Sequence, residues 1–85
     1  MIVSFLPSFL KKAGKLPPSL QDEIDDKISL FKEDSSHPFL KTHKLHGYLR
    51  GKWSFSVNYK YRIIFEYLSK DEVKLLAVGS HSIYN

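Results

Sequence analysis

The sequence contains no cysteine, which excludes a disulfide framework and thiolate metal sites and fits a reducing compartment. It also lacks any run of about 18 apolar residues, so no membrane-spanning helix is expected. The apolar N-terminus, MIVSFLPSFL, has no basic start and is broken by Pro7, unlike a signal peptide. We therefore expect a cytoplasmic protein that makes no contact with a membrane.

A further absence concerns acidic residues, because no Asp or Glu occurs between Ser35 and Phe65. This window contains six Lys or Arg residues and three of the four His, whereas the regions before and after it each have a net charge of −1. The overall charge of +4 is thus concentrated in one segment. A concentrated basic surface is typical of proteins that bind a polyanion, and nucleic acid is the expected one.

The chain of 85 residues is long enough for one small core, so we predict a single domain over residues 1–85. Its hydrophobic content of 42% is ordinary for a globular fold and argues against disorder. A domain this small rarely encloses a deep pocket. Any chemistry is therefore expected on its surface, against a large substrate.

The first half of the sequence predicts a short strand over residues 1–5 and then two helices. Pro7 precedes the first helix, and Pro17-Pro18 forces a turn before the second, which we expect to start at Ser19. One apolar stripe with helical spacing runs along the second helix, formed by Leu20, Ile24, Ile28 and Phe31.

The second half changes to the alternation typical of strands. Apolar residues alternate with polar ones over residues 53–59 and 61–67, and residues 72–78 form a third strand after a turn. The order β-α-α-β-β-β predicts an α+β fold, with two N-terminal helices packed on one face of a small antiparallel sheet. The alternation then places Ser54, Ser56 and Arg62 on the opposite, open face.

Arg62 and the residues His81 and Tyr84 after the last strand form a plausible set for RNA cleavage. The 2′-OH of RNA is an internal nucleophile, so the protein must supply a base, an acid and a cation for the developing phosphate charge. Histidine can act as acid or base, arginine can bind phosphate, and tyrosine can stack on a nucleobase. No metal or other cofactor is expected for this chemistry.

Four segments carry a resemblance to a known family: residues 37–47 (HPFLKTHKLHG), 51–56 (GKWSFS), 61–65 (YRIIF) and 78–84 (VGSHSIY). They resemble the RelE/ParE superfamily of bacterial type II toxins, over nearly the whole chain. The resemblance implies a toxin neutralised by a cognate antitoxin protein, and most often an endoribonuclease that cuts mRNA on the ribosome.

The resemblance also implies roles for individual residues. Arg62 corresponds to the family's strand arginine, His81 to a catalytic residue after the last strand, and Tyr84 to a terminal aromatic. Serine stands at positions 54 and 56, where RelE-type members place lysine, so the chain looks more like a histidine-using branch. We predict that the RNA-binding surface comprises Lys41, His43, Lys44, His46, Arg50, Lys52, Ser54 and Ser56, with His43 and His46 as additional catalytic candidates.

Other interpretations remain open from the sequence. The gyrase-inhibiting ParE-like branch shares the fold without cutting RNA, and a degenerate toxin would keep only antitoxin binding. Arg62 could be a solvated strand residue, and Tyr84 could anchor the C-terminus to the core. A zinc site formed by His37, His43 and His46 is a weak alternative, because it lacks Cys and a nearby carboxylate.

Overall fold

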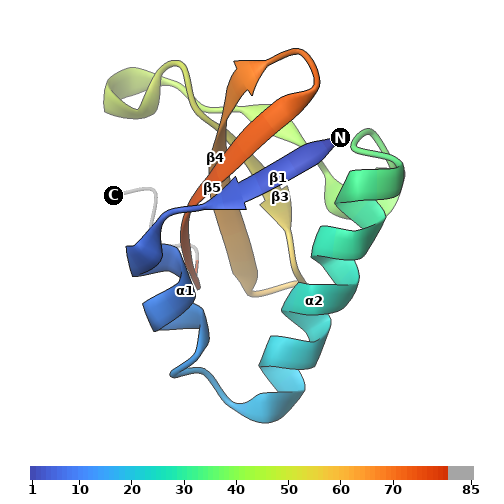
Figure 1. Cartoon of the computed structure of the whole chain (residues 1–85), viewed down its shortest axis with the longest axis vertical. Coiled ribbons are helices and arrows are strands. Elements are labelled where there is room, and N and C mark those ends of the chain that lie inside the picture. Colours follow the sequence, from blue (N-terminus) through green and yellow to red (C-terminus); the bar gives the residue numbers. More distant parts are fainter. Residues whose placement is uncertain (81–85) are drawn as a thin grey trace.

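Five strands form one mixed sheet in the order β1-β5-β4-β3-β2 in the computed structural model, which describes residues 1–80 (Figure 1). Strands β3, β4 and β5 pair antiparallel, as predicted, and β2 pairs antiparallel with β3. β1 pairs parallel with β5 and places Ile2 opposite Glu72, so the sheet is mixed rather than antiparallel throughout. Neither the parallel pair nor the two-residue strand β2 was expected from the sequence. The strands are β1 (Ile2–Phe5), β2 (His43–Lys44), β3 (Trp53–Ser56), β4 (Tyr61–Ser69) and β5 (Glu72–Ser80).

Two helices connect β1 to the rest of the sheet, and each begins with a proline. Pro7 starts α1 (Pro7–Ala13) and Pro18 starts α2 (Pro18–Glu33), one residue before the expected Ser19. Proline suits this position because the N–H groups of a first helical turn have no intrahelical partner. Within the described residues, no helix is both long and apolar enough to cross a membrane.

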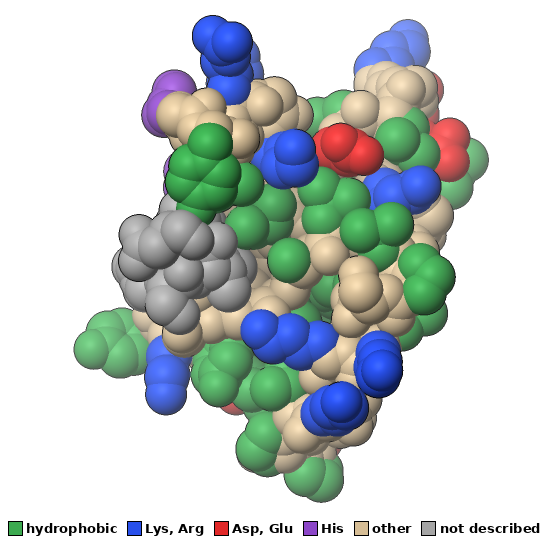
Figure 2. Space-filling view, turned by 90° about the vertical axis from the view of Figure 1, so that its left-hand side faces the viewer, with side chains coloured by type: hydrophobic (Ala, Val, Ile, Leu, Met, Phe, Trp, Pro, Cys, Tyr) green, Lys and Arg blue, Asp and Glu red, His purple; other side chains and the backbone are tan. Residues whose placement is uncertain are grey.

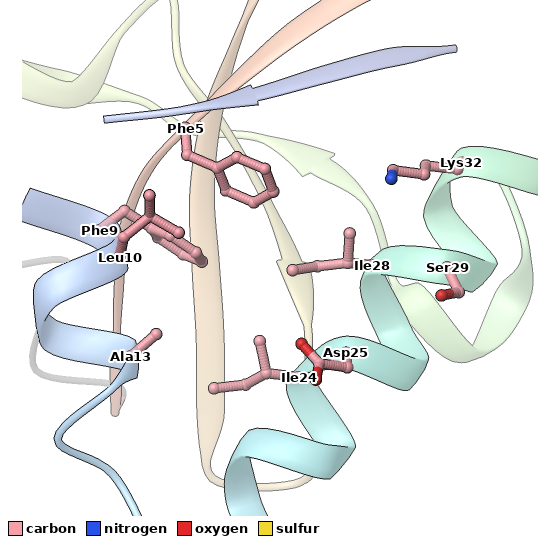
Figure 3. Close-up of a pocket in the computed structure, with 9 residues that line it drawn as sticks. All are labelled: Phe5, Phe9, Leu10, Ala13, Ile24, Asp25, Ile28, Ser29 and Lys32. Atoms are coloured by element: carbon pink, nitrogen blue, oxygen red, sulfur yellow. The ribbon is translucent and has the colours of Figure 1, made fainter. Parts of the chain in front are cut away.

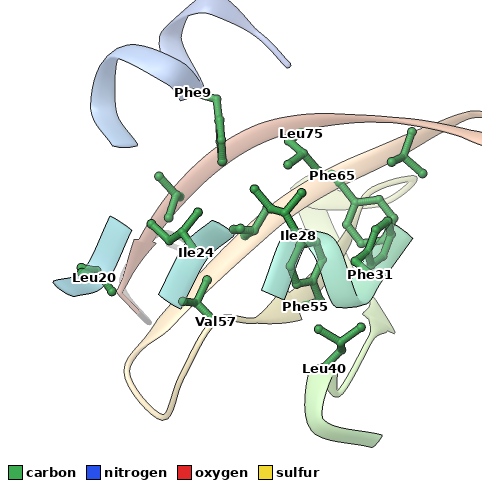
Figure 4. Close-up of a cluster of buried hydrophobic side chains, with 13 residues drawn as sticks. Phe9, Leu20, Ile24, Ile28, Phe31, Leu40, Phe55, Val57, Phe65 and Leu75 are labelled. Atoms are coloured by element: carbon green, nitrogen blue, oxygen red, sulfur yellow. The ribbon is translucent and has the colours of Figure 1, made fainter. Parts of the chain in front are cut away.

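The core lies between these helices and one face of the sheet (Figure 4). All four residues of the predicted α2 stripe are buried, which confirms the helical pattern. At its end the ring of Phe31 stacks on Phe55 with centroids 4.6 Å apart and meets Phe65 at 4.9 Å. Phe9 adds the contribution of α1 to the same cluster. Both helices therefore cover one face, as predicted.

The connection between α2 and β3 contains two short 3-10 turns, η1 (Pro38–Leu40) and η2 (Gly47–Leu49). His37 caps η1, because its Nδ1 accepts a hydrogen bond of 3.1 Å from the backbone N–H of Phe39. The two rings also meet edge to face at 4.8 Å. His37 thus has a local structural role in this connection.

The turn between β3 and β4 starts earlier than the alternating pattern predicted, because β3 ends at Ser56. The side-chain oxygen of Asn58 accepts hydrogen bonds of 2.8 Å from the backbone N–H groups of Lys60 and Tyr61. An Asn that binds the backbone two residues on competes with continued strand pairing. Tyr59 consequently lies at the tip of the turn and is 94% exposed.

Candidate functional site

Arg62 occupies the central strand of the sheet, opposite Ser56 on β3 and Gly79 on β5. Its neighbour Ile63 belongs to the buried core beneath the helices. Because successive strand residues point to opposite faces, Arg62 lies on the face away from the helices. The position predicted from the alternation is therefore confirmed.

The side chain of Arg62 is half-buried and is directed toward the β3–β4 turn. Its Nη1 donates hydrogen bonds to the carbonyls of Asn58 at 2.6 Å, Tyr59 at 3.3 Å and Tyr61 at 3.0 Å. These carbonyl oxygens accept hydrogen bonds from the guanidinium and so fix its orientation. Arg62 is therefore neither a freely solvated strand residue nor a flexible cation, since it is anchored over the turn that it helps to shape.

Ser54 and Ser56 share the face of Arg62, but they are only 0% and 7% exposed. Both serines were expected from the sequence to line an open surface, and that part of the prediction is wrong. A small hydroxyl side chain between larger neighbours is easily covered, and the adjacent Ile64 is itself 4% exposed. The predicted RNA contacts of these serines thus have no exposed side chain to support them in the described structure.

His43 lies on the same face, because it pairs with Ser54 across β2 and β3. Its side chain is exposed, and its Nδ1 lies 2.8 Å from the backbone carbonyl of Lys41. A carbonyl oxygen can only accept, so Nδ1 must carry the hydrogen and Nε2 of the neutral ring keeps its lone pair. This arrangement equips Nε2 of His43 to accept a proton.

Five basic side chains of the acid-free segment lie in or beside the loop that connects β2 to β3. Lys41, Lys44, His46 and Arg50 are exposed and Lys52 is half-buried. Figure 2, which views the left-hand side of Figure 1, shows blue Lys and Arg side chains spread across the molecule, few red acidic ones, and a purple histidine at its upper left edge. An open cavity of about 520 Å³ lies among the loop residues.

Two structural contributors were not identified from the sequence. Trp53 falls in the alternating pattern predicted over residues 53–59 and packs against the core, yet it also lines the loop cavity. Asn58 was read as an ordinary strand residue, yet it shapes the turn that binds Arg62 and its Nδ2 lies 3.3 Å from both carboxylate oxygens of Glu23 on α2. Asn is favoured in turns because its side chain can bind the backbone two residues on, so Asn58 is a signal that could have located this turn.

His81 and Tyr84, the other predicted catalytic residues, lie outside the described residues. β5 ends at Ser80, one residue beyond the partner of Arg62. Among residues 1–80, no three His, Cys, Asp or Glu side chains are placed to hold a metal ion together. The zinc alternative built on His37, His43 and His46 is thus unsupported there, and His37 is instead the cap of η1.

The sequence matches no protein-family model and no curated protein. The structure, however, is similar to a YoeB/ParE toxin from Agrobacterium tumefaciens, with a TM-score of 0.76, 18% identity, and coverage of 95% of this chain and 99% of that one. It is also similar to YafQ from E. coli, with a TM-score of 0.74, 15% identity and coverage of 95% and 93%. A third similar structure is the RelB–RelE antitoxin–toxin complex from Methanococcus jannaschii, with a TM-score of 0.72, 23% identity and coverage of 95% and 94%. The chain therefore has the fold of the RelE/ParE-like toxins.

Proposed function

We propose that this protein is the toxin of a type II toxin–antitoxin system and that it cleaves mRNA in the cytoplasm, in association with the ribosome. The fold is that of RelE/ParE-like toxins, and the cleavage of mRNA is what we propose in addition. The observation that carries it is that the sheet face opposite the helices holds an anchored arginine and an exposed histidine, within a segment that has six Lys or Arg residues and no acidic residue.

The proposed reaction is an internal transfer at one phosphodiester of RNA. The 2′-oxygen attacks the adjacent phosphorus, the bond from phosphorus to the 5′-oxygen breaks, and the products carry a 2′,3′-cyclic phosphate and a 5′-OH. A base takes the proton of the 2′-OH, and Nε2 of His43 has the tautomer for that step. His81 is the proposed acid that returns a proton to the 5′-oxygen. No metal ion is needed for these transfers.

Arg62 is proposed to stabilise the negative charge that develops on the phosphate. A cation fixed before the reaction starts stabilises that charge without reorganising, which is the main benefit of preorganised electrostatics. The carbonyls of the β3–β4 turn supply this fixation. Tyr84 is proposed to position a nucleobase by stacking.

In vitro translation with the purified protein tests this function directly. We expect truncated mRNAs whose new 5′ ends carry a hydroxyl, and no truncation with Arg62→Ala. Parallel reactions on naked mRNA report whether the ribosome is required. Intact mRNA in all reactions, from a folded protein, would refute the enzyme assignment.

The proposed antitoxin has a candidate docking site in the cleft between the two helices (Figure 3). The cleft has a volume of about 300 Å³, and apolar side chains from β1, α1 and α2 face one another across it, among them Phe5, Leu10 and Ile28. Asp25 and Lys32 add one charge of each sign at its α2 side. This lining fits an apolar segment of the antitoxin, and the RelB–RelE structure contains an antitoxin bound to its toxin.

Substitution of Leu10 tests the docking site, because this side chain is 55% exposed while lining the cleft. Leu10→Glu should weaken antitoxin binding in calorimetry and leave RNA cleavage unchanged. Leu68→Glu is the matched control, since Leu68 is 49% exposed on β4 and does not line the cleft. Equal affinity losses in both variants would argue against the cleft.

A gyrase inhibitor is the second candidate function. The observation that favours it is the similarity to a structure described as a YoeB/ParE toxin, because the gyrase-inhibiting ParE-like branch shares this fold. A supercoiling assay separates the two functions. Inhibited gyrase beside intact mRNA would replace the nuclease by this alternative, and inactivity in both assays would point to a degenerate toxin.

A further inference from the structure

The loop between β2 and β3 holds its own shape. It is closed at its base by a hydrogen bond of 2.9 Å from Leu45 N–H to the carbonyl of Lys52. Gly47 and Gly51 have φ angles of +67° and +92°, a region that favours glycine, so the loop can fold back within a few residues. Two internal bonds, from Leu49 N–H to the carbonyl of His46 and from Arg50 N–H to the carbonyl of Gly47, fix its tip. The loop is thus structured before any ligand arrives.

This fold leaves the open cavity of about 520 Å³ on the loop, within the size range of small-ligand sites. Its cationic lining consists of Lys44, Arg50 and Lys52 with His46, and none of the described residues that line it is acidic. Leu45 and Trp53 supply an apolar wall. A concave site with several cations on one side and an indole on the other matches a ligand that is both anionic and aromatic.

Lys44 is already oriented within this cavity. Its Nζ lies 5.5 Å from the centroid of the Trp53 ring, a cation–π contact that restrains a side chain which would otherwise be mobile. Trp53 is held in turn by the rings of Phe65 at 6.5 Å and Tyr67 at 5.3 Å. A charge that is oriented in advance loses less conformational entropy when it binds an anion.

We propose that this cavity, the loop pocket, binds one nucleotide of single-stranded RNA. The phosphate lies among Lys44, Arg50 and Lys52, and the base or sugar lies against Leu45 and Trp53. The inference deepens the proposed function, because it assigns a separate nucleotide subsite to the RNA that Arg62 is proposed to contact.

The loop pocket and Arg62 engage different phosphates. Lys52 precedes Ser56, the cross-strand partner of Arg62, by four residues, which is about 13 Å along a strand at roughly 3.3 Å per residue. The guanidinium of Arg62 points toward Asn58, away from the loop. Lys44 and Trp53 are cross-strand partners on the helix-covered face, whereas Arg62 lies on the opposite face, so we expect no single phosphate to contact both groups. The loop pocket therefore determines where RNA is held relative to the cut, rather than taking part in it.

Trp53 makes the test direct, because it is the only tryptophan of the chain and reports on the loop pocket by its fluorescence. The probe is a labelled 2′-O-methyl RNA oligonucleotide, which lacks the nucleophile and cannot be cleaved. Binding is followed by fluorescence anisotropy of the label and by Trp53 emission, at several salt concentrations. The test variant is Lys44→Gln/Arg50→Gln/Lys52→Gln. Its control is Lys11→Gln/Lys12→Gln/Lys15→Gln, which removes the same charge from exposed positions on or just after α1.

We expect the probe to change Trp53 emission, and the loop variant to bind about tenfold more weakly with a salt slope lower by about 1. The control should bind within about twofold of the unmodified protein. Equal losses in both triple variants, or binding without a change in Trp53 emission, would overturn the loop pocket. Displacement of the probe by a poly-glutamate peptide of equal charge would also overturn it, because the cavity would then be a general anion site.

These outcomes are independent of the nuclease assignment. Binding that depends on the loop pocket, in a protein that leaves mRNA intact, would support the pocket and reject the proposed nuclease. If the protein cleaves mRNA but the loop variant binds the probe as tightly as the unmodified protein does, the nuclease would be supported and the loop pocket rejected. Thermal unfolding of both triple variants shows whether their folds are intact.

Discussion

On the face of the sheet that the helices cover, Phe55, Ile63 and Phe65 are completely buried. On the opposite face the same two strands carry Ser56 and Arg62, and hydrogen bonds to the β3–β4 turn hold the arginine. The first face is closed by aromatic contacts, whereas the second keeps charge near the surface. Alternate residues of one strand thus face the core and the opposite surface, so stability and the proposed RNA contacts should respond to different substitutions.

The largest effect should come from breaking the helix-covered face. Phe31→Ala removes a ring that is 0% exposed and contacts both Phe55 and Phe65. A buried Phe→Ala change costs about 3–5 kcal/mol, a large part of the stability of a small domain. Urea denaturation should show this loss. A decrease in the free energy of unfolding below about 1 kcal/mol would contradict the central role of Phe31 in the core.

On the opposite face, Arg62→Ala should lower RNA cleavage by about 10²-fold or more, because a cation that stabilises the transition state is lost. It should also loosen the β3–β4 turn at a cost of about 1 kcal/mol, since three carbonyls each lose one hydrogen bond, although that of Tyr61 still accepts from the backbone N–H of Val57. Cleavage rates and thermal unfolding should be measured together. Arg62→Lys is the control that keeps the charge without the planar guanidinium. Full cleavage by a folded Arg62→Ala variant would remove Arg62 from the mechanism.

In the proposed mechanism, His43 and His81 transfer protons, whereas His37 has a structural role. His43→Gln and His81→Gln should each lower cleavage by about 10²-fold, because glutamine cannot transfer a proton. Binding of an uncleavable RNA should change little. His37→Gln is the control within the same residue type, since His37 caps η1 and should not affect cleavage. Unchanged cleavage in His81→Gln would transfer the acid role to His43 or His46.

The smallest effects should come from the turn that joins the two faces. Asn58→Ala removes the acceptor of two backbone N–H groups at 2.8 Å and should cost about 1 kcal/mol in urea denaturation. Glu23→Gln perturbs only the exposed contact of 3.3 Å with Asn58 and should cost less than about 0.5 kcal/mol. A larger loss for Glu23→Gln than for Asn58→Ala would show that contact with α2, rather than the turn, is what matters.

The helix-covered face was largely predictable, because periodic burial leaves a local pattern in the sequence. The stripe of Leu20, Ile24, Ile28 and Phe31 and the placement of Arg62 away from the core both follow from spacing alone. The parallel pairing of β1 with β5 was not predictable in this way. It joins Ile2 to Glu72, and no local pattern records a partner so far along the chain.

The opposite face was harder to predict, since its properties depend on neighbours rather than on periodicity. Alternation assigned Ser54 and Ser56 to the correct face, but it could not show that they are covered. The interaction of Arg62 with the turn carbonyls depends on where β3 ends. The hydrogen bonds of Asn58, rather than the alternating strand pattern, determine that end point. The cationic segment was evident from composition, although its cavity appears only when the loop closes at Leu45 and Lys52.

The pairing of β1 with β5 also constrains how the protein can be made. On the ribosome β1 emerges first, yet its partner positions follow about 70 residues later, as the register of Ile2 with Glu72 shows. Hairpins such as β4–β5 form from neighbouring segments, whereas joining distant strands requires closing a long loop and is slow. The nascent chain must therefore keep β1 unpaired until β5 has been synthesised. The sheet can be completed only from that point on.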